Sequence, residues 1–400
     1  MSPERIIVVG AGVFGLSAAV ELARRGYDIE LFEAGAVPNP LAGSTDISKV
    51  CRLEYGSDET YMQWMEQARE IWLEWNAAWL RAGERPLYHE TGVLMVSLDT
   101  MQPGSFEYES FRMLERRGHA PERIGGRELA RRFPAWSPTF EDGFYHAKGG
   151  WAESGRVVEF LAAKAVAHGV ALRSELPVAA VDVQGGRLRG VRTVDGQQRS
   201  AERVVLACGS WAAELAPGVA PSLRRSYHPV WHLRVTDSER FAPERFPVFT
   251  ADISNTGFYG FPVHPEAEVV KVAHHGVAVE APEDGSLTVS EQLTARFRAF
   301  LHARMPALAG AELVNTRLCP YCDSQDEHFW IADDPDCSGL TLATGGSGHG
   351  FKFTPLLGAV IADAVEGVAN PLLDRFAWRS ELRMDFGMEA SRCHSRGDLE

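Results

Sequence analysis

Residues 5–35 read RIIVVGAGVFGLSAAVELARRGYDIELFEAG, and this stretch decides the fold. The apolar run at its start predicts a strand, and LSAAVELARRG after the glycines has the composition of a helix that ends at Gly26. YDIELFE then alternates apolar and polar residues, as a second strand does. Two strands joined by a helix pair in parallel. The chain therefore opens with a βαβ unit of an α/β protein.

The turn between the first strand and the helix carries the pattern G-x-G-x-x-G at Gly10, Gly12 and Gly15. The first glycine permits the tight turn, the second lets backbone approach a pyrophosphate, and the third lets helix and strand pack closely. Glu33 follows at the distance where an acid accepts hydrogen bonds from a ribose. The pattern predicts a bound dinucleotide, NAD or FAD rather than a 2′-phosphorylated cofactor, and does not choose between these two.

Composition narrows the class of protein. The chain has 400 residues, 45% hydrophobic and 24% charged, with a formal net charge of -14. This charge argues against a nucleic-acid or anionic-membrane binder, because both need a basic face. Six irregularly spaced cysteines indicate a reducing compartment, and we see neither a signal peptide nor an apolar run long enough to span a bilayer. We expect a soluble, cytoplasmic protein.

A second glycine-rich loop, LATGGSGHGFKF at residues 342–353, also lies between a predicted strand and a predicted helix. Such small residues indicate that a ligand comes close to the backbone. Further helices are expected at 58–83, 156–169 and 290–306, a hairpin with a Gly-Gly turn at 178–193, a strand at 203–211, and an antiparallel sheet over about 227–279. Residues 85–150 give mixed signals. The aromatic face of 58–83 could line a ligand site, but a buried seam between domains is the commoner use of such a face.

The chain resembles the monomeric sarcosine oxidase family, which includes N-methyltryptophan, pipecolate and fructosyl amino acid oxidases. The resemblance rests on GAGVFG, FEAG, STDISKVCRLEYG, GFYGFP, KVAHHG, RLCPYCDSQDEHFWI and GGSGHGFKF, in order and over nearly the whole chain. It implies a glutathione-reductase-like FAD-binding Rossmann domain, discontinuous and interleaved with an antiparallel-sheet substrate domain. The implied boundaries are 1–84, 150–222 and 326–370 for the FAD domain, 85–149 and 223–325 for the substrate domain, and 371–400 for a C-terminal tail.

The resemblance also implies how FAD is held. Cys319 matches the cysteine that is bonded through sulfur to the 8α-methyl of the flavin, although an inert thiol or a redox pair with Cys322 is the alternative. A zinc site is a poor interpretation, and we expect no metal, because zinc wants four ligands. His349 either lies against the flavin or braces its loop. The other predicted cofactor residues are Gly10, Gly12, Val13, Phe14, Gly15, Glu33, Ala34, Ser44, Thr45, Lys49, Arg52, Gly346, Gly348, Gly350, Phe351 and Lys352.

The same resemblance implies which residues contact the substrate and which assist the reaction with O2. Lys271 corresponds to a lysine over the flavin ring, where a cation stabilises superoxide, and a strand would place His275 on the same face. Arg52 and Lys352 match the residues that bind the substrate carboxylate. Tyr259 and Tyr321 match the aromatic walls of the substrate cavity. Lys49 occupies a position that holds an arginine in sarcosine oxidase and a lysine in fructosyl amino acid oxidases. Thr45 replaces a histidine, and these departures put sarcosine itself in doubt.

The implied activity is oxidation of a secondary amine that carries a carboxylate, such as an N-alkyl amino acid. Hydride transfer to flavin N5 gives an imine that water hydrolyses, and O2 reoxidises the flavin to give H2O2. The alternatives are a fructosyl amino acid oxidase, a biosynthetic oxidase that forms a cyclic imine, a dehydrogenase that uses an electron carrier, and a non-catalytic flavin-binding protein. We expect a monomer whose partners are a small-molecule amine and O2.

Overall fold

The computed structural model describes residues 3–279, 286–379 and 391–392. The chain divides into two compact units, each built from separated segments. Unit 1 comprises Met1–Asp46, Glu153–Ser226 and Pro320–Met388, and unit 2 comprises Ile47–Ala152, Tyr227–Cys319 and Glu389–Glu400. The two units are described separately below.

Unit 1 is an α/β unit around a six-stranded sheet of order β19-β20-β13-β1-β2-β9. All neighbouring strands pair in parallel except β19, which is antiparallel to β20. A three-stranded antiparallel sheet, β10-β11-β12, accompanies it. The strands are β1 (Arg5–Val9), β2 (Asp28–Phe32), β9 (Ala171–Arg173), β10 (Val178–Gln184), β11 (Arg187–Thr193), β12 (Gln198–Ser200), β13 (Arg203–Leu206), β19 (Trp330–Asp333) and β20 (Leu340–Thr344).

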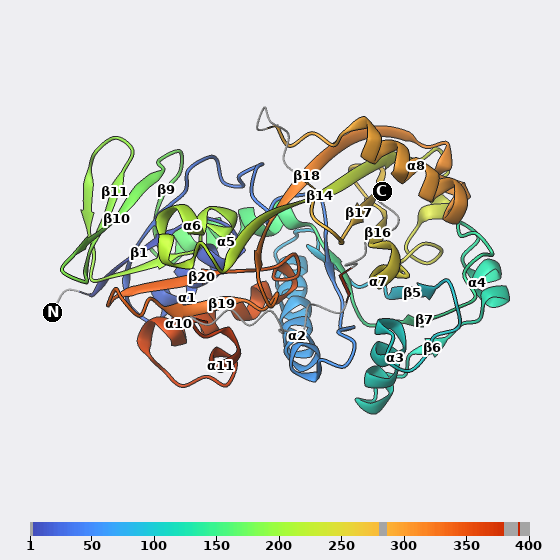
Figure 1. Cartoon of the computed structure of the whole chain (residues 1–400), viewed down its shortest axis with the longest axis horizontal. Coiled ribbons are helices and arrows are strands. Elements are labelled where there is room, and N and C mark those ends of the chain that lie inside the picture. The colour runs from blue at the N-terminus through green and yellow to red at the C-terminus, as the bar shows by residue number, and fades with distance from the viewer. Residues whose placement is uncertain (1–2, 280–285, 380–390, 393–400) are drawn as a thin grey trace. The chain divides into compact units, whose positions relative to one another are not determined.

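Helices and the small sheet sandwich the six-stranded sheet (Figure 1). Alternate residues of β1 point to opposite faces, so Ile7 and Val9 join an apolar cluster with Leu188 and Val191 of β11. Helix α1 packs against α5 and α10. The helices are α1 (Val13–Arg24), α5 (Ser154–Ala167), η1 (Gly209–Trp211), α6 (Ala212–Leu215), η2 (Pro217–Val219), η4 (Phe351–Phe353), α10 (Thr354–Glu366) and α11 (Leu373–Phe376). This is the layered arrangement that the opening βαβ unit predicts.

Unit 2 is built on an eight-stranded sheet of order β18-β14-β17-β16-β15-β5-β7-β6. From β14 to β6 the neighbouring strands are antiparallel except β15 and β5, which are parallel. A smaller sheet has the order β3-β8-β4. The strands are β3 (Lys49–Cys51), β4 (Tyr88–His89), β5 (Val93–Ser97), β6 (Glu122–Arg123), β7 (Asp142–His146), β8 (Gly150–Ala152), β14 (Leu223–Arg234), β15 (Val248–Ala251), β16 (Phe258–Val263), β17 (Val269–His274) and β18 (Glu312–Ser324).

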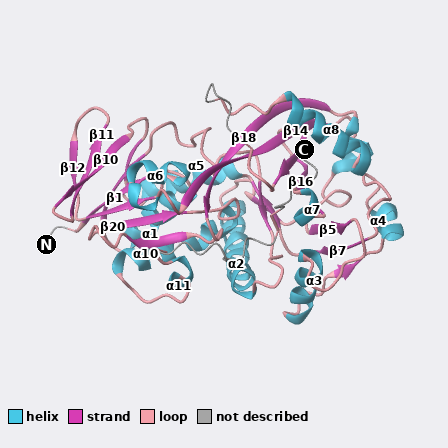
Figure 2. Cartoon of the chain, viewed as in Figure 1, coloured by secondary structure: helices cyan, strands magenta, loops and turns pink. Residues whose placement is uncertain are grey.

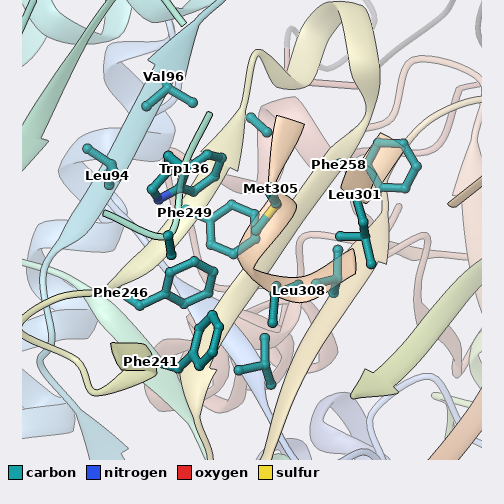
Figure 3. Close-up of a cluster of buried hydrophobic side chains, with 14 of the residues drawn as sticks. Leu94, Val96, Trp136, Phe241, Phe246, Phe249, Phe258, Leu301, Met305 and Leu308 are labelled. Carbon is teal, nitrogen blue, oxygen red and sulfur yellow. The ribbon is translucent and has the colours of Figure 1, made fainter. Parts of the chain in front are cut away.

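One face of this eight-stranded sheet carries the main apolar core of unit 2. Phe249, Phe258 and Trp136 pack there with Leu301 of α8 and Met305, as Figure 3 shows. The helices are α2 (Glu59–Arg81), α3 (Phe106–Arg116), α4 (Gly126–Arg132), η3 (Ser238–Phe241), α7 (Ile253–Thr256), α8 (Glu291–Arg304) and α9 (Pro306–Ala309). Because this face is filled by aromatic and aliphatic side chains, polar residues of the same strands must lie on the opposite face.

The structure refines several sequence expectations. The mixed signals at 85–150 resolve into β4–β8 and two helices that were not predicted, α3 and α4 (Figure 2). Helix α2 lies in unit 2, whereas the expected boundary at residue 84 places it with the nucleotide-binding strands. Its aromatic face is buried within its own unit, where the Trp72 ring lies 6.0 Å from that of Tyr88 of β4. Contacts of this kind along α2 explain why it groups with β4.

The expected tail 371–400 is partly structured. Phe376 of α11 is fully buried against Phe329, and the Trp378 ring lies 5.4 Å from the Trp330 ring. Arg379 forms a 3.0 Å ion pair with buried Asp326. Residues 371–379 therefore extend the core of unit 1. Of the remaining tail, only 391–392 lie within the described residues.

Candidate functional site

The first glycine loop of unit 1 requires glycine at two positions, because a Cβ there would collide with the backbone. Gly10 has φ +103°, and a Cβ there would lie 2.6 Å from the Ala207 carbonyl oxygen. A Cβ on Gly15 would overlap the Gly10 carbonyl oxygen, so this glycine lets α1 start directly against β1. Gly12 is different, because a Cβ there would meet only the Ser44 side chain within 4 Å. Gly12 thus leaves open space at the start of α1, as a phosphate-binding turn requires.

Glu33 is fixed at the end of β2 by three hydrogen bonds. Its Oε2 accepts from the Ala11 backbone N–H at 2.8 Å, and its Oε1 accepts from the Gly35 N–H at 3.1 Å and from Asn39 Nδ2 at 2.9 Å. Ala34 connects Glu33 to Gly35. The carboxylate therefore ties the second strand to the glycine loop and stays where a ribose hydroxyl can reach it.

The start of α1 fits a dinucleotide diphosphate. The Val13 N–H donates to Ser44 Oγ at 3.2 Å, and the first turn of α1 contains no acidic residue. An α-helix of 12 residues with an uncompensated N-terminus favours an anion there. Thr45 follows Ser44 in the same loop, at the end of the first segment of unit 1.

The second glycine loop packs on the first. Gly346 and Gly350 both face the Phe14 ring, and a Cβ on Gly350 would lie 2.9 Å from it. Gly348 has φ +75°, and a Cβ there would overlap the Tyr321 ring. The structure thus brings the predicted residues of the two loops together within unit 1. Tyr321 has a packing role here beyond the expected aromatic wall.

His349 braces this loop. Its Nε2 forms a 2.9 Å hydrogen bond with the Glu327 carbonyl oxygen, and its ring lies 4.8 Å from the Phe329 ring. This contact favours the bracing role over direct chemistry. Phe351 and Lys352 follow in η4, where Lys352 is only 2% exposed, so a charged amine is held inside unit 1. A buried ammonium is retained only where it is paired or used.

The predicted residues of unit 2 gather on the polar face of the eight-stranded sheet. In the antiparallel register, Lys271 of β17 lies opposite His232 of β14, and Ala273 lies opposite Tyr259 of β16. The His275 N–H donates to the Gly257 carbonyl at 2.7 Å, which continues this register. Because side chains alternate, Lys271, His275 and Tyr259 share one face.

Lys271 is almost fully buried on this face. Its Nζ donates a 2.5 Å hydrogen bond to the Ser48 carbonyl oxygen and lies 4.9 Å from the Phe261 ring centroid. The ammonium is therefore held in one place by a backbone acceptor and an aromatic face. A cation fixed in this way is preorganised for developing negative charge.

Two further cations come from β3 and the segment after it. Lys49 Nζ lies 3.4 Å from Cys319 Sγ. Arg52 is 4% exposed, and its Nη2 donates to Ser391 Oγ at 2.7 Å. Its guanidinium lies over two aromatic rings, those of Tyr55 and Phe106. The Lys49–Cys319 contact joins two predicted cofactor residues within unit 2.

Buried acids near Arg52 were not predicted from the sequence. Burial opposes ionisation of Glu54, but its 2.9 Å hydrogen bond with His146 and the charge of Arg52 hold the pKa of this carboxyl below its ordinary value. Burial, reinforced by the charge of Asp252, raises the pKa of Glu107 to about 7. Glu54 follows β3 and Glu107 lies in α3, so only their tertiary packing brings these acids near Arg52.

His228 and His232 of β14 were also missed. The signal that reveals them is the sheet register, since residues paired with Lys271 and His275 share their face. The His228 and His275 ring centroids are 6.2 Å apart, and those of Tyr259 and His275 are 6.5 Å apart. Among the described residues, no group of three His, Cys, Asp or Glu side chains is arranged to hold a metal ion.

Comparison with known proteins agrees with this geometry. The model of the family described as FAD dependent oxidoreductase matches residues 5–364. L-saccharopine oxidase of Schizosaccharomyces pombe is 27% identical over 94% of this chain and 93% of its own. N-methyl-L-tryptophan oxidase of Salmonella arizonae is 27% identical over 90% and 93%, and monomeric sarcosine oxidase of Bacillus sp. is 25% identical over 89% and 91%. Fructosyl amine:oxygen oxidoreductase (Amadoriase I) of Aspergillus fumigatus has a similar fold, with a TM-score of 0.81 at 24% identity over 99% and 94%.

The fold and the two glycine loops define an FAD-dependent enzyme of mixed α/β architecture. This chain belongs to the FAD dependent oxidoreductase family. The expected fold class, the expected enzyme class of FAD-dependent oxidoreductase and the resemblance to the sarcosine oxidases are confirmed. The helices that the structure describes include none long and apolar enough to cross a membrane.

Proposed function

We propose that this protein is an FAD-dependent oxidase of a secondary amine that carries a carboxylate. The observation that carries the proposal is the polar sheet face of unit 2, where Lys271 is fixed beside His275 and Tyr259. The amine-oxidising relatives support it. When bound, FAD would supply the two-electron oxidation of the carbon beside the amine nitrogen, with O2 as the final acceptor and H2O2 as its product.

The chain's own residues supply binding, orientation and charge. The start of α1, Glu33 and the second glycine loop would hold FAD in unit 1. Arg52, fixed by Ser391 and two aromatic rings, would bind the substrate carboxylate, because a guanidinium donates two parallel hydrogen bonds. Lys352 is a second candidate cation for the carboxylate, because its side chain is buried. Lys271 would stabilise the anionic charge that forms on oxygen.

The decisive experiment is a peroxide assay of the holoenzyme with sarcosine, larger N-methyl amino acids, pipecolate, saccharopine and fructosyl-glycine. We expect at least one secondary amine with a carboxylate to give H2O2 and to bleach the flavin anaerobically. Lys271→Met should slow reaction with O2 more than anaerobic bleaching, and Lys148→Met, outside this sheet face, is the control. If no secondary amine bleaches the flavin, the proposal fails.

We further propose that Cys319 bonds covalently to FAD. The hydrogen bond from Lys49 Nζ to Cys319 Sγ at 3.4 Å supports this, because it holds the sulfur atom that would form the bond in one position. Acid precipitation of the holoenzyme should leave the flavin with the protein, and Cys319→Ser should release it to the supernatant. Cys337→Ser is the matched control. Flavin that stays soluble in the wild type would refute the link.

A fructosyl amino acid oxidase is the second candidate. Lys49 and Thr45 favour it, and fructosyl-glycine in the same assay tests it. Pipecolate in that assay tests for an oxidase that forms a cyclic imine, and in a dehydrogenase the substrate would bleach the flavin without rapid peroxide formation.

The five cysteines within the described ranges form no disulfide with one another, which supports the cytoplasm as the compartment. We also propose that the protein is a monomer.

A further inference from the structure

Two buried acids of unit 2 interact with the charge of Arg52. Arg52 is 4% exposed, and Glu54 and Glu107 are 0% and 1% exposed. Burial raises the pKa of each carboxyl and the charge of Arg52 lowers it, so both acids lie near the guanidinium. A carboxylate that pairs with an arginine occupies the N–H groups that a ligand carboxylate needs. Arg52 therefore binds a ligand carboxylate only while other partners hold these acids.

Glu54 is held by His146 at the end of β7. Glu54 Oε1 accepts a 2.9 Å hydrogen bond from His146 Nδ1, and Glu54 Oε2 has no hydrogen-bond partner among the residues that the structure describes. An ionised carboxylate only accepts hydrogen bonds, so the proton of this bond belongs to Nδ1. The acid that follows Arg52 by two residues is thus bonded to an imidazole rather than to the guanidinium.

The His146 ring is packed in one orientation. It is 1% exposed and lies 5.6 Å from the His119 ring, with the ring planes at 68°. His119 is itself fixed, because its Nε2 lies 2.5 Å from Glu66 Oε1 and its Nδ1 lies 3.3 Å from Lys148 Nζ. This edge-on packing keeps His146 Nδ1 directed at Glu54.

Glu107 has a different partner. The Ile253 backbone N–H donates to its carboxyl, and burial, reinforced by the charge of Asp252, raises its pKa to about 7. At pH 6 most molecules therefore carry Glu107 in its neutral, protonated form. Of the two acids near Arg52, Glu54 is then the one that is ionised.

We propose that His146 is a positioning residue, which holds the Glu54 carboxylate away from Arg52 and so lets the guanidinium bind a ligand carboxylate. This inference rests on the role of Arg52 in the proposed function. Without His146, the buried Glu54 carboxylate loses its hydrogen bond, and turning towards Arg52 gives it a new partner. Glu54 then competes with the ligand for the same N–H groups. Even while it is held by His146, its negative charge repels a ligand carboxylate.

The test is calorimetric titration of the holoenzyme with butyrate at pH 6, together with KM and kcat for an amine that the peroxide assay identifies. Glu54→Gln keeps an acceptor for His146 and removes the negative charge, so it should tighten butyrate binding about fivefold. A purely structural role of Glu54 predicts no gain in affinity. His146→Leu should weaken butyrate binding about tenfold and raise KM, with a much smaller change in kcat.

The Glu54→Gln background separates this positioning role from a general loss of stability. In that background His146→Leu should change butyrate affinity by less than about twofold, because no carboxylate remains to turn towards Arg52. His146→Asn, which keeps an N–H donor for Glu54, should restore most of the affinity that His146→Leu loses. Arg52→Met should abolish butyrate binding, which shows that the titration measures binding at Arg52.

Glu66→Gln is the matched control, because Glu66 also bonds a histidine but has Arg117 as its cation. It should leave butyrate affinity as in the wild type. Weaker or unchanged binding in Glu54→Gln overturns the proposal, as does an equal effect of His146→Leu with and without Glu54. A wild type that binds no butyrate, or binding that survives in Arg52→Met, refutes the role of Arg52 and this inference with it. If butyrate binds at Arg52 but no amine is oxidised, the proposed function fails, and the titration alone decides the role of His146.

Discussion

Glu107 couples the stability of unit 2 to pH. It lies in the first turn of α3, is 1% exposed, and has a pKa raised by burial and by Asp252 from 4.5 to about 7. A raised carboxyl pKa means that the unfolded chain loses its proton first as pH rises. Wild-type stability should therefore fall between about pH 4.5 and pH 7, and then stay level.

The magnitude follows from the pKa values of Glu107 in the folded and unfolded chain. A tenfold difference in proton affinity corresponds to about 1.4 kcal/mol, and the destabilisation grows by about 2.5 kcal/mol between pH 5 and pH 8. Glu107→Gln removes the titrating group and keeps a side chain of similar shape. The free energy of unfolding of this variant, relative to the wild type, should thus improve by about that amount from pH 5 to pH 8.

Thermal melts of holoenzyme at both pH values measure the effect. For a unit of about 200 residues the difference between variant and wild-type Tm should move by several degrees in favour of the variant. Glu109→Gln on the same helix controls for loss of a carboxylate, because Glu109 is less buried. A Tm difference that is constant with pH, or that moves against the variant, would refute the reasoning.

Three other changes test the packing directly. Gly348→Ala should cost at least about 2 kcal/mol and weaken flavin retention, because φ is +75° and the new Cβ meets Tyr321; thermal melts and flavin content measure both. Glu54→Ala should cost about 3–5 kcal/mol, since His146 loses its buried partner; a Tm like that of the wild type contradicts this. Lys49→Met should slow covalent flavin attachment, followed as acid-precipitated flavin over time; unchanged kinetics would exclude its role.

Local signals in the sequence predicted the elements that carry a motif or a clear periodicity. The fingerprint at 5–35 correctly predicted β1, α1 and β2, and the Gly185–Gly186 turn produced the β10–β11 hairpin, because both residues adopt positive φ. The parallel β15–β5 pair was not predictable in this way, since its partners are about 150 residues apart. Parallel pairing depends on tertiary packing rather than on a local turn.

The residues of the candidate site also differ in whether local sequence signals could predict them. Motifs located Lys271 and Arg52, because their flanking residues carry the resemblance. His228 has no such local mark, and only the strand register places it beside the site residues. Glu54 lies in the same motif as Arg52, but its partner His146 is about 90 residues away, so the motif did not reveal their pairing. A single sequence does not show which residues far apart in the chain lie close together in the fold.

The strand order of unit 1 also bears on how the chain is made. β13 ends at Leu206, but its neighbour β20 spans Leu340–Thr344, so one edge of β13 stays unpaired until well over a hundred further residues have been synthesised. At about 5–20 residues per second, this interval lasts roughly 7–30 s. During this interval the edge of β13 that faces away from β1 is open to wrong partners. A chain truncated before residue 340 should therefore be prone to aggregation.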